Sequence, residues 1–187
     1  MNSEPLNIIV AVTGASGSIY ARLLFEELRR FRLGQTGVMF SEKAKEIWAY
    51  EIGTFPDDLP YNIYDNNNFN APFASGSSLF DVMIVCPCSM GTMGRIANGL
   101  SDTLITRTAD VMLKERRRLI LAIRETPVHL IHINNMQTLT QAGAIIAPAS
   151  PSFYSNPKSV DELAMTVVDR LLQLAGLKKE TYRWGDD

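Results

Sequence analysis

The sequence contains little of what defines several protein classes. Its 187 residues include 2 cysteines and 2 histidines, and its formal net charge is −2, so it lacks the bulk positive field that nucleic acid requires. No apolar run approaches the roughly 18 residues that a membrane-spanning helix needs. The first residues, MNSEPLNIIVAV, contain an early Glu and no basic stretch, unlike a secretory signal. We therefore expect no nucleic-acid partner and no membrane span.

The two cysteines, Cys86 and Cys88, stand in a Cys-Pro-Cys triplet. This spacing is too short for an ordinary structural disulfide. A zinc site needs four ligands, and only His129 and His132 could complete one. Two reduced thiols at the end of a buried strand are the simpler interpretation, so we expect no metal and a cytoplasmic location.

Strand-like and helix-like segments alternate along the chain. Short β-branched runs are followed by segments whose apolar residues recur at the helical spacing. Residues 52–78, rich in Asn, Asp, Pro, Gly and Ser, are instead predicted to form a long irregular loop. The pattern predicts strands over residues 8–12, 37–40, 81–86, 119–123 and 144–147, and helices over residues 19–30, 42–51, 89–99, 102–116, 129–142 and 159–175.

This order of elements predicts an α/β fold with a mostly parallel sheet and helices on both faces. Right-handed crossovers restrict such a three-layer fold to Rossmann-like or flavodoxin-like arrangements. No repeat or domain boundary interrupts residues 1–187, so we expect a single domain. Its polar tail, residues 178–187, contains Trp184, and a Trp in such a tail indicates that it packs onto the body of the protein or that it covers a site or a neighbouring subunit.

A glycine-rich turn follows the first predicted strand. Backbone N–H groups of such a turn, with the helix that it opens, can bind a phosphate. The turn is not GxGxxG, so the dinucleotide fingerprint is missing. A tight strand-to-helix turn without a ligand would need similar glycines, and both interpretations stay open. The turn reads Thr13-Gly14-Ala15-Ser16-Gly17-Ser18.

A second turn of this kind, Cys88-Ser89-Met90-Gly91-Thr92, ends the third predicted strand. Simple capping of the next helix by Ser89 explains it equally well. Ser41 follows the second strand as another N-cap residue. In an open α/β sheet, ligands bind where the carboxyl ends of the strands meet. The two turns and Ser41 together predict a cradle for a phosphate and a planar ring, as in a mononucleotide.

Residues 107–127 carry the clearest charge pattern. Arg107 and Lys114 are seven residues apart and share one face of a continuous helix, which could hold a dianion such as a phosphate monoester. The three arginines at positions 116–118 are interpreted as solvated. The strand at 119–123 leads into Arg124-Glu125-Thr126-Pro127, which places a polar group at its carboxyl end.

Glu51 and Glu125 are the candidate acid/base groups. Glu51 ends a predicted helix just before the long loop, where a solvated carboxylate is the default interpretation. Glu125 could equally form a structural ion pair with Arg124 beside it. Tyr154 could offer its hydroxyl to a ligand or cover the core. No Ser-His-Asp or Cys-His pattern is evident, and the two histidines are expected to pack or cap.

Many of these segments resemble the UbiX-type flavin prenyltransferases, formerly described as aromatic-acid decarboxylases. The resemblance covers nearly the whole chain, and the interval between KERR and RETP is its most specific part. The matching segments are TGASGSIYARLL (13–24), SGSS (75–78), CPCSMGTMGRIANG (86–99), RTADVMLKERR (107–117), RETP (124–127), HINNM (132–136), FY-x-x-P (153–157) and Arg183-Trp184.

The resemblance implies a homododecameric, flavodoxin-like protein with FMN sites where subunits meet. Members of the family attach a dimethylallyl group from dimethylallyl monophosphate to N5 and then C6 of reduced FMN, without a metal. Their product, prenylated FMN, serves UbiD-type decarboxylases. For this chain we therefore expect FMN, dimethylallyl monophosphate and a UbiD-type partner.

The resemblance also assigns site residues by motif. Ser16 and Glu51 match the family's pair near flavin N5, Lys114 would stabilise the departing phosphate, and Glu125 beside it could take up a proton. The expected FMN contacts are Gly14, Ala15, Ser16, Ser41, Ser89, Met90, Gly91, Thr92 and Arg124. The expected prenyl-phosphate contacts are Arg107, Lys114, Glu125, Tyr154 and Arg170, with Trp184 closing the pocket.

Two positions depart from the family pattern. Phe69 stands where members often have a Trp, and Phe73 stands where they often have a Pro; both are expected at the pocket wall. An FMN-dependent decarboxylase of the cysteine-decarboxylase type would share the cradle but need no prenyl-phosphate site. A non-catalytic flavin-binding subunit would not need both Ser16 and Glu51. The presence of both sets of residues favours the prenyltransferase.

Overall fold

Six parallel strands form one sheet in the order β3-β2-β1-β4-β5-β6, which confirms the predicted fold class. The structure, a computed structural model, describes residues 5–56 and 59–179. The strands are β1 (Ile8–Val12), β2 (Thr36–Phe40), β3 (Asn62–Tyr64), β4 (Val82–Cys88), β5 (Arg118–Ile123) and β6 (Ile145–Ile146).

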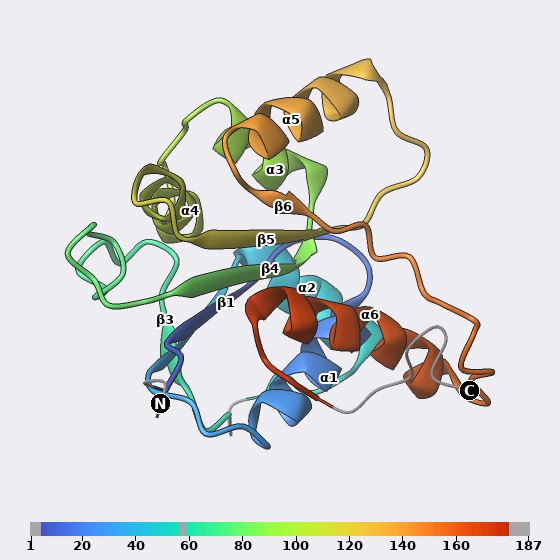
Figure 1. Ribbon diagram of the computed structural model, residues 1–187. Helices are drawn as coiled ribbons and strands as arrows, with labels where there is room; N and C mark the ends of the chain where they lie inside the picture. The colour runs from blue at the N-terminus through green and yellow to red at the C-terminus, as the bar shows by residue number, and fades with distance from the viewer. Residues whose placement is uncertain (1–4, 57–58, 180–187) are drawn as a thin grey trace.

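Helices cover both faces of the sheet and complete three layers (Figure 1). Side chains of α1, α2 and α6 pack on one face, and side chains of α3, α4 and α5 pack on the other. The helices are α1 (Ser18–Leu28), α2 (Glu42–Glu51), α3 (Met90–Ala97), α4 (Leu104–Lys114), α5 (Leu130–Gln141) and α6 (Val160–Ala175).

The sheet buries its central strands completely. Every residue of β1 and β4 is buried, because helices remove both of their faces from water. Alternate residues of β1 divide between the two halves of the core: Ile8 and Val10 face α1 and α6, whereas Ile9 and Ala11 face α3 and α4. This explains why these strands read as continuous apolar runs in the sequence.

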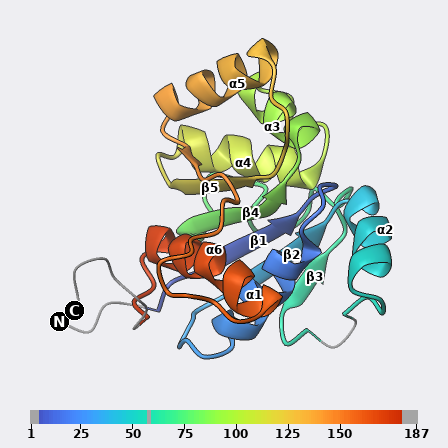
Figure 2. The ribbon, with the colours of Figure 1, turned by 90° about the vertical axis from the view of Figure 1, so that its right-hand side faces the viewer.

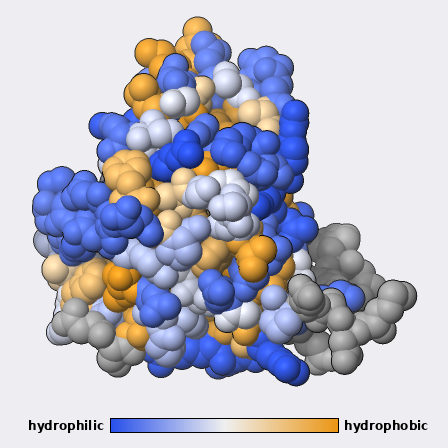
Figure 3. Space-filling model, turned by 90° about the vertical axis from the view of Figure 1, so that its left-hand side faces the viewer, coloured by the Kyte–Doolittle hydropathy of each residue, from blue (hydrophilic) through white to orange (hydrophobic). Residues whose placement is uncertain are grey.

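Because the strands are parallel, the sheet has two different edges. Ile8, Thr36, Val82 and Arg118 pair in register where their strands start, and we term this end the amino edge. The turns after β1, β2, β4 and β5 lie at the opposite end, the carboxyl edge. Figure 2 faces the carboxyl edge, and Figure 3 shows the amino edge as a largely hydrophilic surface with separate hydrophobic spots.

Most predicted elements differ from the structure by one or two residues at their ends, and two differences have a clear physical reason. The prediction of an irregular loop over residues 52–78 is wrong at β3, which pairs with β2 at the side of the sheet. Its three residues are too few and too exposed to leave an apolar pattern. The helix predicted over residues 102–116 spans only Leu104–Lys114, because Thr103 forms a capping box with Thr106.

The described residues also bear on the expectations about metal ligands, membrane-spanning helices and the C-terminal tail. No group of three or more His, Cys, Asp or Glu within residues 5–56 and 59–179 could hold a metal ion. In the same residues, no helix combines the length and the apolar character that crossing a bilayer requires. Lys179 pairs with Asp169 of α6 and Glu27 of α1. Trp184 and the rest of the tail beyond residue 179 lie outside the described residues.

Candidate functional site

The structure brings the two predicted turns and Ser41 together at the carboxyl edge. They line one pocket of about 280 Å³. Thr13, which is buried, ties the turns to each other: its hydroxyl donates to Pro87 O at 2.9 Å and accepts from the amide of Ser89 at 2.8 Å. The predicted cradle residues that line the pocket are Gly14, Ser41, Ser89, Gly91 and Thr92.

The pocket exposes amide groups at the starts of α2 and α3. Ser41 caps α2 by accepting from Ala44, and Ser89 caps α3 by accepting from Thr92. Within the described part of the chain, no hydrogen bond occupies the amides of Glu42 and Lys43, or those of Met90 and Gly91. Two helix N-termini with free N–H groups make a site for an anion, so the residues fit the phosphate of a mononucleotide.

A third helix, α4, begins at the same pocket, which no pattern in the sequence indicated. Asn66, which follows β3, accepts hydrogen bonds from the first two amides of α4. The amide of Leu104 donates to the backbone carbonyl of Asn66 at 2.7 Å, and the amide of Ile105 donates to Asn66 Oδ1 at 3.0 Å. Asn66, Thr103 and Thr106 all line the pocket. The segment after β3 therefore closes one side of the site.

Ser16 and Glu51 meet, as predicted. The carboxylate of Glu51 accepts from the amide of Gly17 at 3.0 Å and from that of Ser18 at 2.7 Å, and the Ser16 hydroxyl is a further partner. Partial burial acts to raise the pKa of Glu51, but these hydrogen bonds outweigh it, and the pKa lies below its usual value. Glu51 is an exposed carboxylate, as its default interpretation has it, but it also binds the start of α1.

Arg124 and Glu125 lie where β5 ends, beside the turn after β4. The amide of Arg124 donates to Cys88 O at 3.3 Å. Burial raises the pKa of the Tyr20 phenol on α1. The positive charge of the Arg124 guanidinium opposes this rise, so the two groups lie near each other. Glu125 is exposed and accepts from the amide of Thr126, and no ion pair links it to Arg124 within the described residues.

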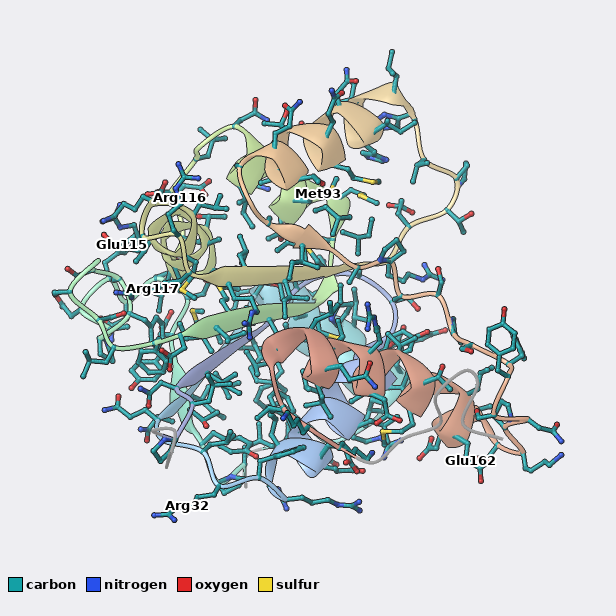
Figure 4. All side chains as sticks on the ribbon, in the orientation of Figure 1. Arg32, Met93, Glu115, Arg116, Arg117 and Glu162 are labelled. Atoms are coloured by element: carbon teal, nitrogen blue, oxygen red, sulfur yellow. The ribbon has the colours of Figure 1, made fainter. Side chains whose placement is uncertain are left out.

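Arg107 and Lys114 share one face of α4, as their spacing predicts. Arg107 donates to Ala74 O at 3.0 Å, and Lys114 Nζ lies against Gly76 and pairs with Glu115. Both therefore flank the loop that contains the SGSS segment, and Lys114 lies toward the amino edge. In Figure 4, Glu115 at this end of α4 and Glu162 at the start of α6 lie at opposite sides of the molecule.

Tyr154 and Arg170 lie apart from Lys114 within this chain. Tyr154 is exposed in the segment between β6 and α6, and Arg170 is an exposed residue of α6 that contacts Gln173. Arg170 lines a second pocket, of about 470 Å³, between that segment and α6. One subunit thus holds the expected prenyl-phosphate residues at two separate places.

Several side chains differ from the sequence interpretation. Phe73 is buried between Tyr64 and Phe80, so it belongs to the core rather than to a pocket wall, whereas Phe69 is half-exposed. Arg117 and Arg118 are not idle: they donate to Gly76 O and Ala175 O, respectively.

The cysteines and histidines have packing roles, as expected. Cys86 and Cys88 are free and buried, and burial raises the pKa of both thiols, that of Cys88 to about 12. The rings of His129 and His132 stack with centroids 3.6 Å apart. No thiolate or imidazole is therefore poised for catalysis among these residues.

Two basic pocket residues escaped the sequence analysis, Lys43 and Arg95. Lys43 lies in the first turn of α2, where the helix macrodipole disfavours a cation. This unfavourable placement was the signal that could have identified it.

Comparison with known proteins gives consistent results. Residues 1–173 match the family model described as Flavoprotein. The chain is 45% identical over 183 residues to the flavin prenyltransferase UbiX of Thermoplasma acidophilum, covering 96% of this chain and 100% of that protein.

Two solved structures are also similar. The crystal structure of AnUbiX with FMN and dimethylallyl pyrophosphate has a TM-score of 0.90 and 40% identity, and covers 97% of this chain and 100% of that one. A dodecameric FMN-dependent UbiX-like decarboxylase from Escherichia coli O157:H7 has a TM-score of 0.91 and 36% identity, and covers 95% of this chain and 99% of that one.

Proposed function

Because the chain belongs to the UbiX flavin prenyltransferase family, we propose that it transfers a dimethylallyl group from dimethylallyl monophosphate to reduced FMN. New bonds at flavin N5 and C6 would give prenylated FMN. The observation that carries this proposal is the carboxyl-edge pocket, where the starts of α2 and α3 present free amides and where the turn that holds Ser16 contributes Gly14. FMN supplies the nucleophilic ring, and the protein supplies binding, orientation and proton handling.

The residues at the carboxyl edge suit this cofactor. Gly14, Ala15, Ser41, Ser89, the hydroxyl of Thr92 and the amides of Met90 and Gly91 would hold its phosphate and ribityl chain. Arg124 at the end of β5 would face the ring. Glu51 is charged at neutral pH, as a carboxylate whose pKa lies below its usual value must be, so with Ser16 it would accept a hydrogen bond from the ring's N–H and orient that proton.

The prenyl donor needs cationic groups that stabilise its departing phosphate. Lys114 and Arg107 would supply two charges, and Arg170 and Tyr154 would supply a third charge and a hydroxyl. Since one chain places Lys114 away from Tyr154 and Arg170, we propose that two subunits complete each donor site. Glu125 would then accept a proton, and Trp184 in the 178–187 tail would close the pocket.

Exposed apolar side chains support assembly of copies of this chain. Val128, Leu130, Ile131 and Ile133, which precede or lie on α5, are between 44% and 68% exposed. Such a patch on one helix marks an interaction surface. The similar E. coli protein is dodecameric, and we propose a dodecamer here too. Ile131→Glu should lower the assembly mass in light scattering, whereas Gln137→Glu on the same helix should not.

The alternative is an FMN-dependent decarboxylase of the cysteine-decarboxylase type. It would need the flavin cradle but no site for a prenyl phosphate. The complete set of Lys114, Glu125, Tyr154 and Arg170 favours the prenyltransferase. A decarboxylase would release carbon dioxide from a peptide with a C-terminal cysteine and pass two electrons from the peptide to oxidised FMN, without adding a prenyl group to the flavin.

One experiment separates the two functions. The protein is incubated anaerobically with reduced FMN and either dimethylallyl monophosphate or diphosphate, and the flavin is analysed by mass spectrometry. The proposal predicts a flavin heavier by one prenyl group, and no such product without the donor. Unchanged flavin with both donors, together with decarboxylation of a cysteine peptide, would reject it in favour of the alternative.

We further propose that the product serves a UbiD-type decarboxylase in the cytoplasm. The two buried free thiols suit a reducing compartment. Adding the reaction mixture to an apo UbiD-type enzyme should restore decarboxylation of its aromatic or acrylic acid substrate, whereas FMN alone should not.

A further inference from the structure

Two basic side chains line the carboxyl-edge pocket and have no role so far. Lys43 belongs to the first turn of α2, and Arg95 belongs to the last turn of α3. Both side chains are at least half-exposed, and they belong to the two helices, α2 and α3, that start at this pocket. Their only acidic neighbour in the lining is Asp102. The pocket therefore holds two positive groups and one negative group.

Lys43 is positioned by its contact with the first turn. A Cβ added to Gly14 would lie 2.7 Å from Lys43 Cγ and 2.8 Å from Lys43 Cβ, so the aliphatic stem lies directly over that glycine. The ammonium group pairs with Glu46 at the surface, at 2.5 Å. An exposed ion pair of this kind contributes little, so the ammonium can turn to a stronger anion at small cost.

Arg95, on α3, also has only weak contacts with its neighbours. Its Nε lies 3.3 Å from Asp102 Oδ2, and its Nη1 donates to Gly91 O at 3.4 Å. Both distances are long for charge-assisted hydrogen bonds, which are usually about 2.7–2.9 Å. The guanidinium thus lies beside the free amides of α3 without being firmly engaged.

The three helix starts at the pocket differ in whether their backbone amides are free to bind a ligand. Those of α4 are already taken by Asn66 and Thr103, so α4 closes the pocket but offers no donors. Those at the starts of α2 and α3 remain open, and Lys43 and Arg95 stand beside these two open ends. The free amides and the two basic residues therefore belong to one pocket.

We propose that Lys43 and Arg95 determine specificity for the phosphorylated flavin, so that FMN binds in preference to riboflavin, with Asp102 limiting this preference. The inference rests on the proposed function, because it assumes that the pocket takes a flavin. Neutralising Lys43 or Arg95 removes an electrostatic attraction to the phosphate, which FMN has and riboflavin lacks. Neutralising Asp102 removes an electrostatic repulsion of the same phosphate.

The test is titration of the full-length protein with FMN and with riboflavin, followed by flavin fluorescence and calorimetry. Lys43→Gln and Arg95→Gln should each weaken FMN binding by about tenfold and leave riboflavin binding within about twofold. Asp102→Asn should move the FMN-to-riboflavin ratio in the opposite direction. Lys45→Gln is the matched control, since Lys45 lies on the same helix, pairs with Glu42 and does not line this pocket.

The outcomes separate this inference from the proposed function. If the parent protein binds neither flavin, both fail. If the parent binds FMN and riboflavin equally, or if Lys43→Gln and Arg95→Gln leave the ratio at the Lys45→Gln value, only the specificity assignment fails. Added salt should weaken FMN binding more in the parent than in the two variants, and an equal salt dependence would also overturn the assignment.

Discussion

Glu51 Oε2 accepts a hydrogen bond of 2.7 Å from the amide of Ser18, the first residue of α1. The N-cap of α1 is Gly17, which has φ 115° and no side chain with which to cap the helix. A carboxylate at the end of α2 therefore does what Ser, Thr or Asp does at other helix starts. The same group is our candidate for handling the proton at flavin N5, so one carboxylate would both stabilise α1 and take part in the proposed reaction.

The first prediction concerns this carboxylate. Glu51→Gln keeps an oxygen that can accept from Gly17 and Ser18 but removes the negative charge and the proton-accepting group. Prenylation should fall by two or more orders of magnitude, as is typical for loss of a general acid/base. FMN binding should stay close to that of the parent. Turnover is measured by mass spectrometry of the flavin, and near-parental turnover would show that Glu51 has no role in proton transfer.

The second prediction concerns pH. The pKa of Glu51 is lower in the folded protein than its usual value of 4.5, so its contribution to stability is present above that value. The contribution is lost as pH falls through the lower, folded pKa. Urea unfolding of the parent and of Glu51→Gln should thus show a stability difference at pH 7 that shrinks by pH 3. A difference that stays constant over this range would contradict the pKa shift.

The third prediction tests the packing of β2. A Cβ at Gly37 would lie 2.6 Å from Cε1 of Phe73, whose ring is held in the core between Tyr64 and Phe80. Gly37→Ala should lower the free energy of unfolding by about 1–3 kcal/mol, as overpacking does. Adding Phe73→Leu supplies room, so the double variant should lose less than the sum of the two single losses. Strict additivity would mean that the two positions do not touch.

The fourth prediction tests the start of α4. Asn66→Ala removes the side-chain acceptor of the Ile105 amide and should cost about 1–2 kcal/mol in the free energy of unfolding. Asn67→Ala is the control, because the Asn67 side chain has no hydrogen bond within residues 59–179. Chemical denaturation measures both. Equal losses in the two variants would show that the clamp on α4 is unimportant.

The fifth prediction tests the shared donor site. Lys114→Ala should weaken binding of the prenyl phosphate with little effect on FMN, and added salt should weaken donor binding less in this variant than in the parent. Arg170→Ala should behave similarly. If two subunits complete each site, mixed oligomers of the two variants should recover part of the activity, because some sites then contain neither substitution. Mixed oligomers no more active than either variant would place both residues in one subunit's site.

Much of the fold follows from short-range patterns. The buried runs of β1, β4 and β5 and the amphipathic spacing of α1 and α6 identify these elements, because burial on both faces or on one face leaves a direct record in the sequence. Ser41, Ser89 and Ser159 mark helix starts for an equally local reason. By contrast, β3 exists only because β2 offers it an edge, and its Asn-Ile-Tyr sequence carries no such record.

The sequence by itself determined the order of elements other than β3, the parallel sheet and the two turns at its carboxyl edge, since these depend on residues close together along the chain. The tertiary structure alone decided which distant groups meet. It placed Glu51 on the start of α1, Asn66 on the start of α4 and Lys43 over Gly14, and it separated the end of α4 at Glu115 from the start of α6 at Glu162. Such contacts depend on how helices pack on the sheet, and chain spacing does not encode that packing.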